Sequence, residues 1–430
     1  MTQTKKIKKK RWSYFPVCTG CFLIVAAVVF SSFYLNGKTF VWDSDGVTQH
    51  FNALVYYRSW LREILRTLFV EHRLEIPLWD LKIGYGSDIL TTLHYYAYGD
   101  LLNLLSVFVP KTEWMDEFYT LLILLRVYLA GLAFSYFCFQ RGEKRFPVLL
   151  GALLYAFSFW TIYAAVRHPY FMNPMIYFPL VLAGADRIFQ KKRPFLYIFS
   201  LAAAILSNFY FGYMICILVI LYCFFRYRTL FGKFQWKKLA GWAGRFLGYS
   251  ISALMLASVL LVPVVFCALS AGRLSGDRWI PLFYVPSYYK GFLSAFLSGE
   301  AGNWTEMGYT AYGLLGVLLL FLQKKKNTQL KAGFFLMTAF LLIPFAGYVM
   351  NGFSYAANRF SWAYAMLVAY IFVHTWEDLV KLTARQKKQL LLAGIVCAAV
   401  CMAFEEGRTE AALCALALFG VLLLWLLSAG

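Results

Sequence analysis

Residues 17–35 read VCTGCFLIVAAVVFSSFYL, an uncharged apolar run that follows the basic segment Lys5–Arg11. A helix needs about 20 mainly apolar residues to cross the hydrocarbon core of a bilayer. Similar runs recur to the end of the chain, and each must be helical because unpaired backbone groups are costly in lipid. The first run is too long for the core of a cleaved signal peptide, so we expect it to be an uncleaved membrane anchor.

The composition excludes a soluble globule. Hydrophobic residues make up 61% of the 430 residues and charged residues only 14%, whereas soluble domains contain about 45–50% apolar residues. The net charge of +20 comes from short basic runs between apolar segments, which is typical of topology signals, and we expect no nucleic-acid partner. The nine cysteines lie in or beside apolar segments, which favours helix packing over a metal or redox role.

The basic runs predict the topology. If all of them are cytoplasmic, 18 of the 22 lysines lie inside and each pair of runs is separated by an even number of crossings. The chain is then an all-α, polytopic bundle of about 11–12 spans in the bacterial cytoplasmic membrane, with a cytoplasmic N-terminus. The basic runs are Lys5–Arg11, Arg141–Arg145, Lys191–Arg193, Arg226–Lys238, Lys324–Lys331 and Lys381–Lys388.

The predicted spans are 15–35, 118–140, 146–166, 173–189, 240–268, 308–323, 332–350, 359–376, 390–403 and 410–428. The segment 195–225 is interrupted at 207–212 and predicts two short helices or a re-entrant hairpin. Three regions follow from this division. Residues 1–14 form a basic cytoplasmic N-terminus, 15–376 form the main transmembrane module, and 377–430 form an additional C-terminal transmembrane hairpin.

The outer loop 36–117 is too long for a simple connector, and loops of this length are usually functional. Within it, apolar residues in Gln49–Val70 recur at helical spacing, and Arg58, Arg62 and Arg66 form a row along one face. This pattern predicts a helix lying in the headgroup plane. The second outer loop, 270–307, is rich in Tyr and Trp, which is ordinary for a membrane interface. Its aromatic residues include Trp279, Tyr284, Tyr288, Tyr289 and Trp304.

Asp43 and Asp45 follow the first span closely, so their carboxylates are expected near the membrane surface, where a lipid-bound substrate would lie. One could take a proton from an acceptor hydroxyl while the other binds a cation or orients the site. Gln49 and His50 add polar groups immediately afterwards. Asp-x-Asp alone is a weak signal, since surface acids explain most occurrences. The sequence requires no cofactor, although Asp43 with Asp45 could bind Mg²⁺ or Mn²⁺.

Cationic residues stand at the outer ends of other spans. Arg359 and Arg167 could each bind a phosphate through the planar guanidinium fork, and His168 could assist. The alternatives are an arginine that snorkels to the headgroups and a histidine in ordinary packing. Turn or helix-capping roles are the default for three further acids of the first outer loop. These acids are Asp80, Asp88 and Asp100.

The chain contains no Walker-type phosphate loop, dinucleotide fingerprint, His-x-x-x-His zinc pattern or Gly-x-Ser-x-Gly elbow, which weakens ATP-driven transport and common hydrolase chemistry. It does contain a characteristic set of short motifs. They are Asp45-Gly46-x-x-Gln49, Pro77–Asp80 with Gly84–Asp88, Tyr95-Tyr96 with Gly99-Asp100, Arg167–Pro169, Phe209–Tyr213, and Asn351–Ser354 with Asn358-Arg359. With these motifs the chain resembles, over nearly its whole length, the bacterial YfhO family of GT-C superfold glycosyltransferases.

The resemblance implies transfer of a sugar from a polyprenyl-phosphate carrier to a cell-envelope polymer such as lipoteichoic acid, by inverting displacement at the outer face. The family's catalytic acid maps onto Asp45, with Asp43, Gln49 and His50 as supporting or cation-binding candidates. Arg359, Arg167 and His168 become candidates for binding the donor phosphate. Nucleotide sugars are made inside the cell, so an outer site needs a lipid carrier. The family continues with a soluble outer domain and a last span, which implies a truncated member.

Two other classes of function remain open from the sequence. A transporter or flippase for a lipid-linked saccharide would also use arginines near the membrane and broken helices such as 207–212. A noncatalytic scaffold for envelope assembly would suit a chain that lacks one of its family's domains. Charged residues gather at the outer ends of the spans and not at mid-membrane, which favours the enzyme over the transporter.

Overall fold

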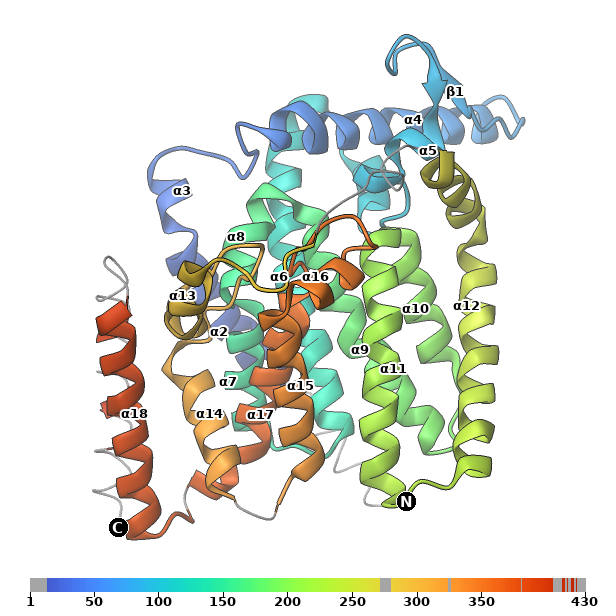
Figure 1. Ribbon diagram of the computed structural model, residues 1–430. Coiled ribbons are helices and arrows are strands. Elements are labelled where there is room, and N and C mark those ends of the chain that lie inside the picture. Colours follow the sequence, from blue (N-terminus) through green and yellow to red (C-terminus); the bar gives the residue numbers. More distant parts are fainter. Residues whose placement is uncertain are drawn as a thin grey trace.

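The computed structural model describes residues 14–270, 280–323, 326–379 and 381–404, together with 412, 413, 416, 419, 420 and 423. Helices stand side by side, and α4 (Phe51–Phe69) lies across one end of the bundle (Figure 1). We call this end the α4 face. The opposite end is the basic face, which carries Arg141–Arg145, Lys191–Arg193 and Arg226–Lys238. Three parts of the prediction fall outside the described residues. They are the basic N-terminus up to residue 13, Trp279, and most of the predicted span 410–428.

Most predicted spans coincide with helices. The segment 195–225 lies in two helices, α10 (Phe195–Ser207) and α11 (Phe209–Phe231). The prediction of two short helices is right for α10, whereas α11 has 23 residues and is long and apolar enough to cross a membrane. Asn208 separates them, and its Oδ1 accepts from the backbone N–H groups of Tyr210 and Phe211, which caps α11. The other helices in the predicted spans are α2 (Tyr14–Val29), α3 (Ser31–Leu35), α6 (Met115–Gln140), α7 (Arg145–Ala156), α8 (Phe159–Arg167), α9 (Asn173–Phe189), α12 (Trp236–Ser270), α14 (Thr310–Leu322), α15 (Thr328–Leu342), α16 (Pro344–Met350), α17 (Ser361–Leu379) and α18 (Ala384–Phe404).

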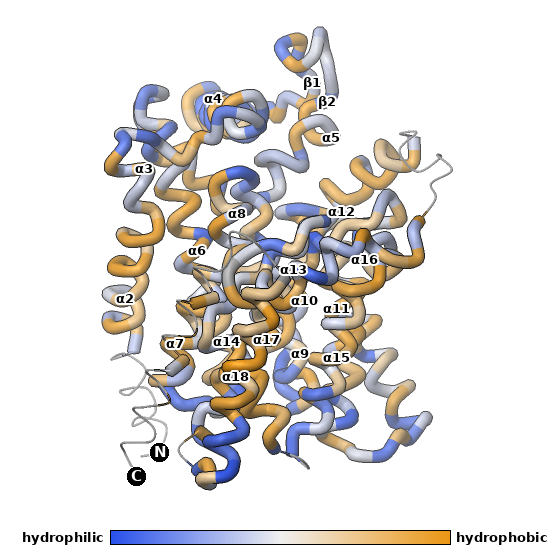
Figure 2. The backbone as a smooth tube through the Cα atoms, turned by 60° about the vertical axis from the view of Figure 1, so that its left-hand side comes forward, coloured by the Kyte–Doolittle hydropathy of each residue, from blue (hydrophilic) through white to orange (hydrophobic). Residues whose placement is uncertain are grey.

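Two of the predicted spans are bent. The pair α7 and α8 bends by 46°, and the pair α15 and α16 bends by 93°. Pro344 begins α16 after the extended residue Ile343, because proline has no N–H to continue the hydrogen bonding of α15. Among the described residues, four helices are long and apolar enough to cross a membrane, or up to six if each bent pair is one span. Figure 2 shows that hydrophobic residues make up most of each helix and that hydrophilic residues lie toward both ends of the bundle. The all-α membrane fold is confirmed.

Glycines bring several of these helices into close contact. A Cβ added at Gly184 of α9 would lie 2.5 Å from the backbone nitrogen of Tyr197 in α10, and one at Gly316 of α14 would lie 2.6 Å from the Cα of Phe372 in α17. Small residues at such crossings let helix backbones approach, which is how helices gain packing energy in lipid. These crossings explain why glycine occurs inside apolar helices, where it otherwise costs stability.

The loop 36–117, which the topology prediction places outside and which we continue to call the first outer loop, is built around α4. The short π-helix η1 (Gly46–His50) leads into α4. The antiparallel strands β1 (Trp79–Asp80) and β2 (Ser87–Asp88) form a small hairpin. The rest of the loop consists of α5 (Ile89–Leu93), η2 (His94–Tyr98), η3 (Asn103–Phe108) and η4 (Thr112–Trp114). The helix predicted at Gln49–Val70 is therefore confirmed.

Two of the three arginines in the predicted row on α4 bind backbone carbonyls of the same loop. Arg58 is 6% exposed and donates to the carbonyls of Val109 and Pro110. Arg62 donates to the same two carbonyls at 2.9 and 3.0 Å. These carbonyls precede η4, so two of the three arginines fix the loop to α4. Arg62 and Arg66 are both exposed, and Arg66 pairs with the nearby Glu63 and Glu71.

A buried ion pair ties the same loop to the bundle. Arg126 of α6 donates to Asp100 at 2.6 Å and to Asn103 at 2.8 Å, and Asn173 of α9 donates to Asp100 at 3.0 Å. All four side chains are about 1% exposed. Asp100 also accepts from the backbone of Leu102, so its predicted turn role is confirmed, but its larger role is to hold the loop on α6 and α9. The turn and capping roles of Asp80 and Asp88 are likewise confirmed.

Candidate functional site

Asp45 lies on the α4 face at the start of η1. The following residue, Gly46, is buried, and a Cβ there would lie 2.9 Å from Trp42 Cβ, so glycine allows the chain to fold back onto Trp42. Gln49 Nε2 donates to Asp45 Oδ1 at 2.9 Å, and the Tyr96 hydroxyl donates to Gln49 Oε1 at 2.9 Å. This chain of hydrogen bonds orients the Asp45 carboxylate while Oδ2 has no hydrogen-bond partner among the described residues.

Asp43 differs from Asp45. Its side chain is exposed, and it forms no hydrogen bond or ion pair with any residue that the structure describes. Among these residues there is also no group of three or more His, Cys, Asp or Glu side chains that could hold a metal ion. Cation binding by Asp43 with Asp45 therefore stays a prediction.

Two neutral histidines connect the first outer loop to the end of α8. His50 Nε2 lies 3.2 Å from His168 Nδ1. Burial lowers the pKa of His50 from its ordinary value to about 3, and proximity to His168 lowers it further. Burial lowers the pKa of His168 to about 4, although Asp45 raises it. Both rings are uncharged near neutral pH, so one donates and the other accepts.

Arg167 at the end of α8 is held by aromatic rings. Its guanidinium carbon lies 4.1 Å from the centre of the Tyr163 ring and 5.9 Å from that of Trp42. Contacts of this kind stabilise a cation without using its N–H groups. No hydrogen bond or ion pair joins Arg167 to another described residue, so its donors remain available to a ligand.

Arg359 is held in the same way. Its guanidinium carbon lies 4.4 Å from the centre of the Trp304 ring, 5.6 Å from Tyr355, 5.8 Å from Phe171 and 5.9 Å from Tyr210. It forms no ion pair with any described carboxylate, and its buried Nε has no hydrogen-bond partner. A buried donor without a partner is costly, and an anionic ligand would satisfy it.

Asn358 positions the Arg359 loop. Its side chain is fully buried and donates to the Tyr288 hydroxyl at 3.0 Å, to Thr305 Oγ1 at 2.9 Å and to the Leu341 carbonyl at 3.0 Å. Its backbone N–H donates to the carbonyl of Asn303. Asn358 thus joins the second outer loop, which supplies Trp304, to the loop that supplies Arg359.

The predicted site residues converge on His168. Asp45, Arg359 and Arg167 all act electrostatically on its ring, while Trp42 and Trp304 lie against it with ring centres 5.8 and 5.7 Å away. The structure brings together six of the seven predicted side chains and leaves Asp43 apart. Those six are Asp45, Gln49, His50, Arg167, His168 and Arg359.

The aromatic members of the site were not predicted. Trp304 reads in the sequence as an ordinary interfacial aromatic, yet it provides the nearest ring to Arg359. Its own φ is 62° and that of Asn303 is 49°, conformations that are uncommon for residues other than glycine and that often occur at functional sites. Tyr96 belongs to one of the sequence motifs, but the sequence predicted no role for it or for Trp42.

Comparison with known proteins is consistent with this architecture. The model of the family "Bacterial membrane protein YfhO" matches residues 18–429. The chain belongs to the YfhO family. A YfhO relative from Bacillus subtilis (strain 168), described as an uncharacterized protein, is 25% identical over 400 residues. The match covers 87% of this chain and 42% of that relative, so this YfhO-family chain spans less than half of its length. No solved structure matches the chain. The resemblance to the YfhO family is confirmed.

Proposed function

We propose that this YfhO-family chain is a membrane glycosyltransferase that moves a sugar from a polyprenyl-phosphate carrier to a cell-envelope polymer of the lipoteichoic-acid type. One observation supports this most strongly. Arg167 and Arg359, which form no ion pair with any described residue, contact Trp42 and Trp304, the two rings that lie against His168, and the charge of Asp45 raises the pKa of the same histidine. A transfer from a phosphate-linked donor needs both cations for the phosphate and a base for the acceptor.

The arginines suit the donor phosphate. Arginine binds phosphate oxygens through two parallel N–H groups, and Arg359 has a buried Nε that lacks a partner. In the proposed step the bond between the anomeric carbon and the phosphate oxygen breaks, and negative charge grows on the departing polyprenyl phosphate. Cations already held in place by aromatic rings would stabilise that charge with little reorganisation.

Asp45 suits the acceptor. Its Oδ2 has no partner among the described residues, whereas Oδ1 is held by Gln49. Asp45 takes the proton of the acceptor hydroxyl as the hydroxyl oxygen forms its bond to the anomeric carbon, which completes an inverting single displacement. The hydrogen bond between the neutral rings of His50 and His168 joins the loop that carries Asp45 to the end of α8 that carries Arg167.

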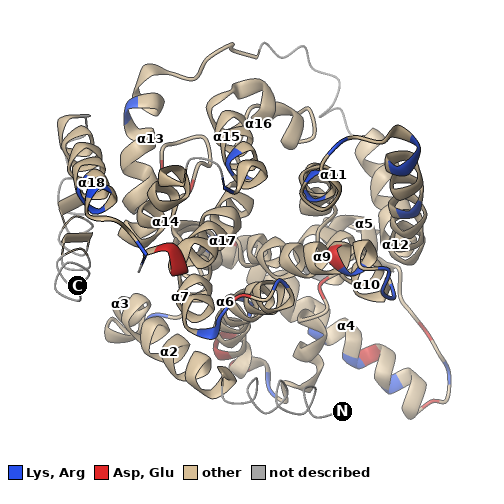
Figure 3. Ribbon diagram, turned by 90° about the horizontal axis from the view of Figure 1, so that it is seen from below, with Lys and Arg blue, Asp and Glu red and all other residues tan. Residues whose placement is uncertain are grey.

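The proposed location is the outer face of the bacterial cytoplasmic membrane. The lysine-rich basic face is assigned to the cytoplasm by the positive-inside rule, and Figure 3 shows Lys and Arg at the ends of α11, α12 and α18 there. The α4 face with Asp45 is then outside, where a lipid carrier supplies the sugar.

Mass spectrometry of envelope polymers from cells with and without the gene tests the proposal. We expect one hexose or N-acetylhexosamine substituent to disappear in the deletion, to return with the wild-type gene and to stay absent with Asp45→Asn. Unchanged polymers in the deletion would contradict the proposal. Restoration by Asp45→Asn would favour a noncatalytic scaffold. A flippase would instead move labelled lipid carrier across proteoliposomes faster than protein-free vesicles do.

A further inference from the structure

A cavity lies toward the basic face, with a volume of about 550 Å³. Residues from α6, α9, α11, α15 and α17 line it, including Leu218 and Arg226 of α11 and Met337 of α15. This volume is within the range of about 300–1,000 Å³ that is usual for ligand pockets.

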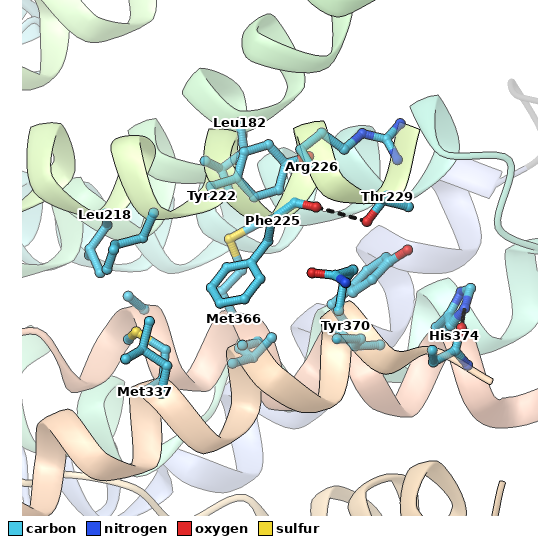
Figure 4. Close-up of a pocket in the computed structure, with 18 of the residues that line it drawn as sticks. Leu182, Leu218, Tyr222, Phe225, Arg226, Thr229, Met337, Met366, Tyr370 and His374 are labelled. Carbon is cyan, nitrogen blue, oxygen red and sulfur yellow. Dashed lines mark hydrogen bonds between the residues drawn. The ribbon is translucent and has the colours of Figure 1, made fainter. Parts of the chain in front are cut away.

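The cavity has an apolar end and a polar end. Figure 4 shows Leu182, Leu218, Met337 and Met366 gathered at one end of the cavity, with Arg226, Thr229, Tyr370 and His374 toward the other. The polar end lies at the C-terminal part of α11, where the basic run Arg226–Lys238 begins. A ligand that fits both ends has a charged head and a hydrocarbon tail.

The charge at the polar end is positive. Asp186, whose side chain is 1% exposed, pairs with Arg226 Nε at 2.6 Å and with Arg141 Nη1 at 3.0 Å. Arg228 also lines the cavity and forms no ion pair with any described residue. Glu143 adds a second carboxylate, bonded to His374 and Tyr370. Three arginines and two carboxylates therefore lie at this end, which leaves a net positive charge.

Arg226 and Arg141 each have N–H groups that form no hydrogen bond with the described residues. Arg226 uses Nε for Asp186, and its two terminal nitrogens form no hydrogen bond with any described residue. Arg141 directs Nε to Tyr370 and Nη1 to Asp186 and Tyr222, which leaves Nη2 without such a partner. Asp186 fixes both guanidinium groups, so their remaining donors are positioned beforehand for an anion.

We propose that this cavity binds one anionic phospholipid from the membrane leaflet on the basic face. The headgroup phosphate would accept hydrogen bonds from Arg226 and Arg141, and one acyl chain would fill the apolar end beside Leu218 and Met337. Basic pockets between membrane helices bind anionic headgroups for the same electrostatic reason. The proposal does not depend on the glycosyltransferase assignment.

The cavity is separate from the Asp45 site. Tyr210, which contacts Arg359, and Arg226 belong to the same helix and are sixteen residues apart, which corresponds to about 24 Å along the helix axis. A lipid bound at Arg226 is therefore at the opposite end of the bundle from the proposed donor phosphate.

Native mass spectrometry of the purified full-length protein in detergent tests the proposal. Phosphatidylglycerol, phosphatidylcholine and inorganic phosphate are added separately. We expect one phosphatidylglycerol per protein, bound about tenfold more tightly than phosphatidylcholine. Arg226→Gln should weaken phosphatidylglycerol binding about tenfold, whereas Arg245→Gln, which removes an exposed arginine of α12, should leave it unchanged.

A second variant keeps every charge. A Cβ at Gly333, which lines the cavity on α15, would meet no atom within 4 Å, so Gly333→Leu should fill the apolar end without disturbing the helices. Its control is Gly244→Leu, an equally unobstructed glycine in α12. Unchanged lipid binding in Gly333→Leu would overturn the proposal. So would equal binding of the two lipids, or saturable binding of inorganic phosphate without binding of phosphatidylglycerol.

Discussion

At the scale of single residues, the site is distinguished by how it holds charge. Arg167 and Arg359 lie against aromatic rings and form no ion pair with any carboxylate in the described part of the chain, so their charge is available to a ligand. Asp45 is oriented through one oxygen by Gln49. The sequence predicted these three residues because each stands at an outer end of a span. It could not predict Trp304, since no spacing rule relates residue 304 to residue 359.

Arg359→Lys tests whether sugar transfer needs the planar guanidinium group of Arg359 or only its positive charge. Lysine keeps the charge but lacks the planar fork and is more strongly hydrated, so we expect the rate of sugar transfer to fall by about 10²-fold. The rate of transfer from a labelled polyprenyl-phosphate sugar in proteoliposomes provides the measurement. Arg73→Lys, in an exposed arginine that pairs with Glu71 and Glu75, should transfer at the wild-type rate. Similar rates for both variants would show that Arg359 serves only as a positive charge.

The histidine pair predicts a dependence of stability on pH. The pKa of His50 is about 3 in the folded protein and 6.5 in a model peptide. Below pH 6.5 the unfolded chain binds a proton that the folded protein does not, so stability is complete above pH 6.5 and falls as the pH drops toward 3. At pH 5 the loss is about 2 kcal/mol.

Thermal unfolding at pH 7.5 and pH 5.0 measures this effect. The decrease in Tm between the two should be smaller in His50→Gln than in the wild type, because glutamine does not titrate. His72→Gln, at an exposed position, should show the wild-type decrease. An equal decrease in all three proteins would rule out His50 as the source.

At the scale of helices and loops, the first outer loop is fixed to the bundle by buried polar contacts. The apolar length of the spans and the helical spacing in Gln49–Val70 were enough to predict the helices. The direction of Arg58 and the pairing of Asp100 with Arg126 were not predictable, because both depend on which loop carbonyls and carboxylates the fold brings near. The bend at Pro344 could be predicted locally, because a proline inside an apolar span interrupts the helix.

Asp100→Ala tests the pair between the loop and α6. It leaves the guanidinium of Arg126 buried without a carboxylate, so we expect a loss of about 3–5 kcal/mol in stability and faster proteolysis within the first outer loop. Limited proteolysis and thermal unfolding provide the two readouts. Asp43→Ala removes an exposed acid that forms no hydrogen bond or ion pair with the described residues, and should change neither. If both variants behaved alike, the pair would not anchor the loop.

At the scale of the whole molecule, two charged sites stand at opposite ends of one helical bundle. The α4 face carries Asp45 with Arg359, and the basic face carries the Asp186 cluster. Local sequence predicted the bundle because the bilayer imposes length and apolarity on each span. The cavity between α11 and α15 arises from packing between distant segments, which periodicity does not reveal.

Cysteine labelling tests the predicted orientation. In a Cys267→Ser background, we expect Lys82→Cys on the α4 face to react with a membrane-impermeant maleimide in intact cells. Lys237→Cys on the basic face should react only after the cells are made permeable. Both lysines are exposed, so access to the reagent depends on the side of the membrane. The reverse labelling pattern would place Asp45 in the cytoplasm.

The proposed function is tested most directly by one reaction with purified protein. The full chain is reconstituted with a labelled polyprenyl-phosphate sugar and an envelope polymer, and label in the polymer is measured for wild type, Asp45→Asn and Asp43→Asn. We predict that Asp45→Asn loses transfer by at least about 10²-fold while Asp43→Asn stays near the wild-type rate. Transfer by Asp45→Asn at the wild-type rate would contradict the assignment of Asp45 as the base.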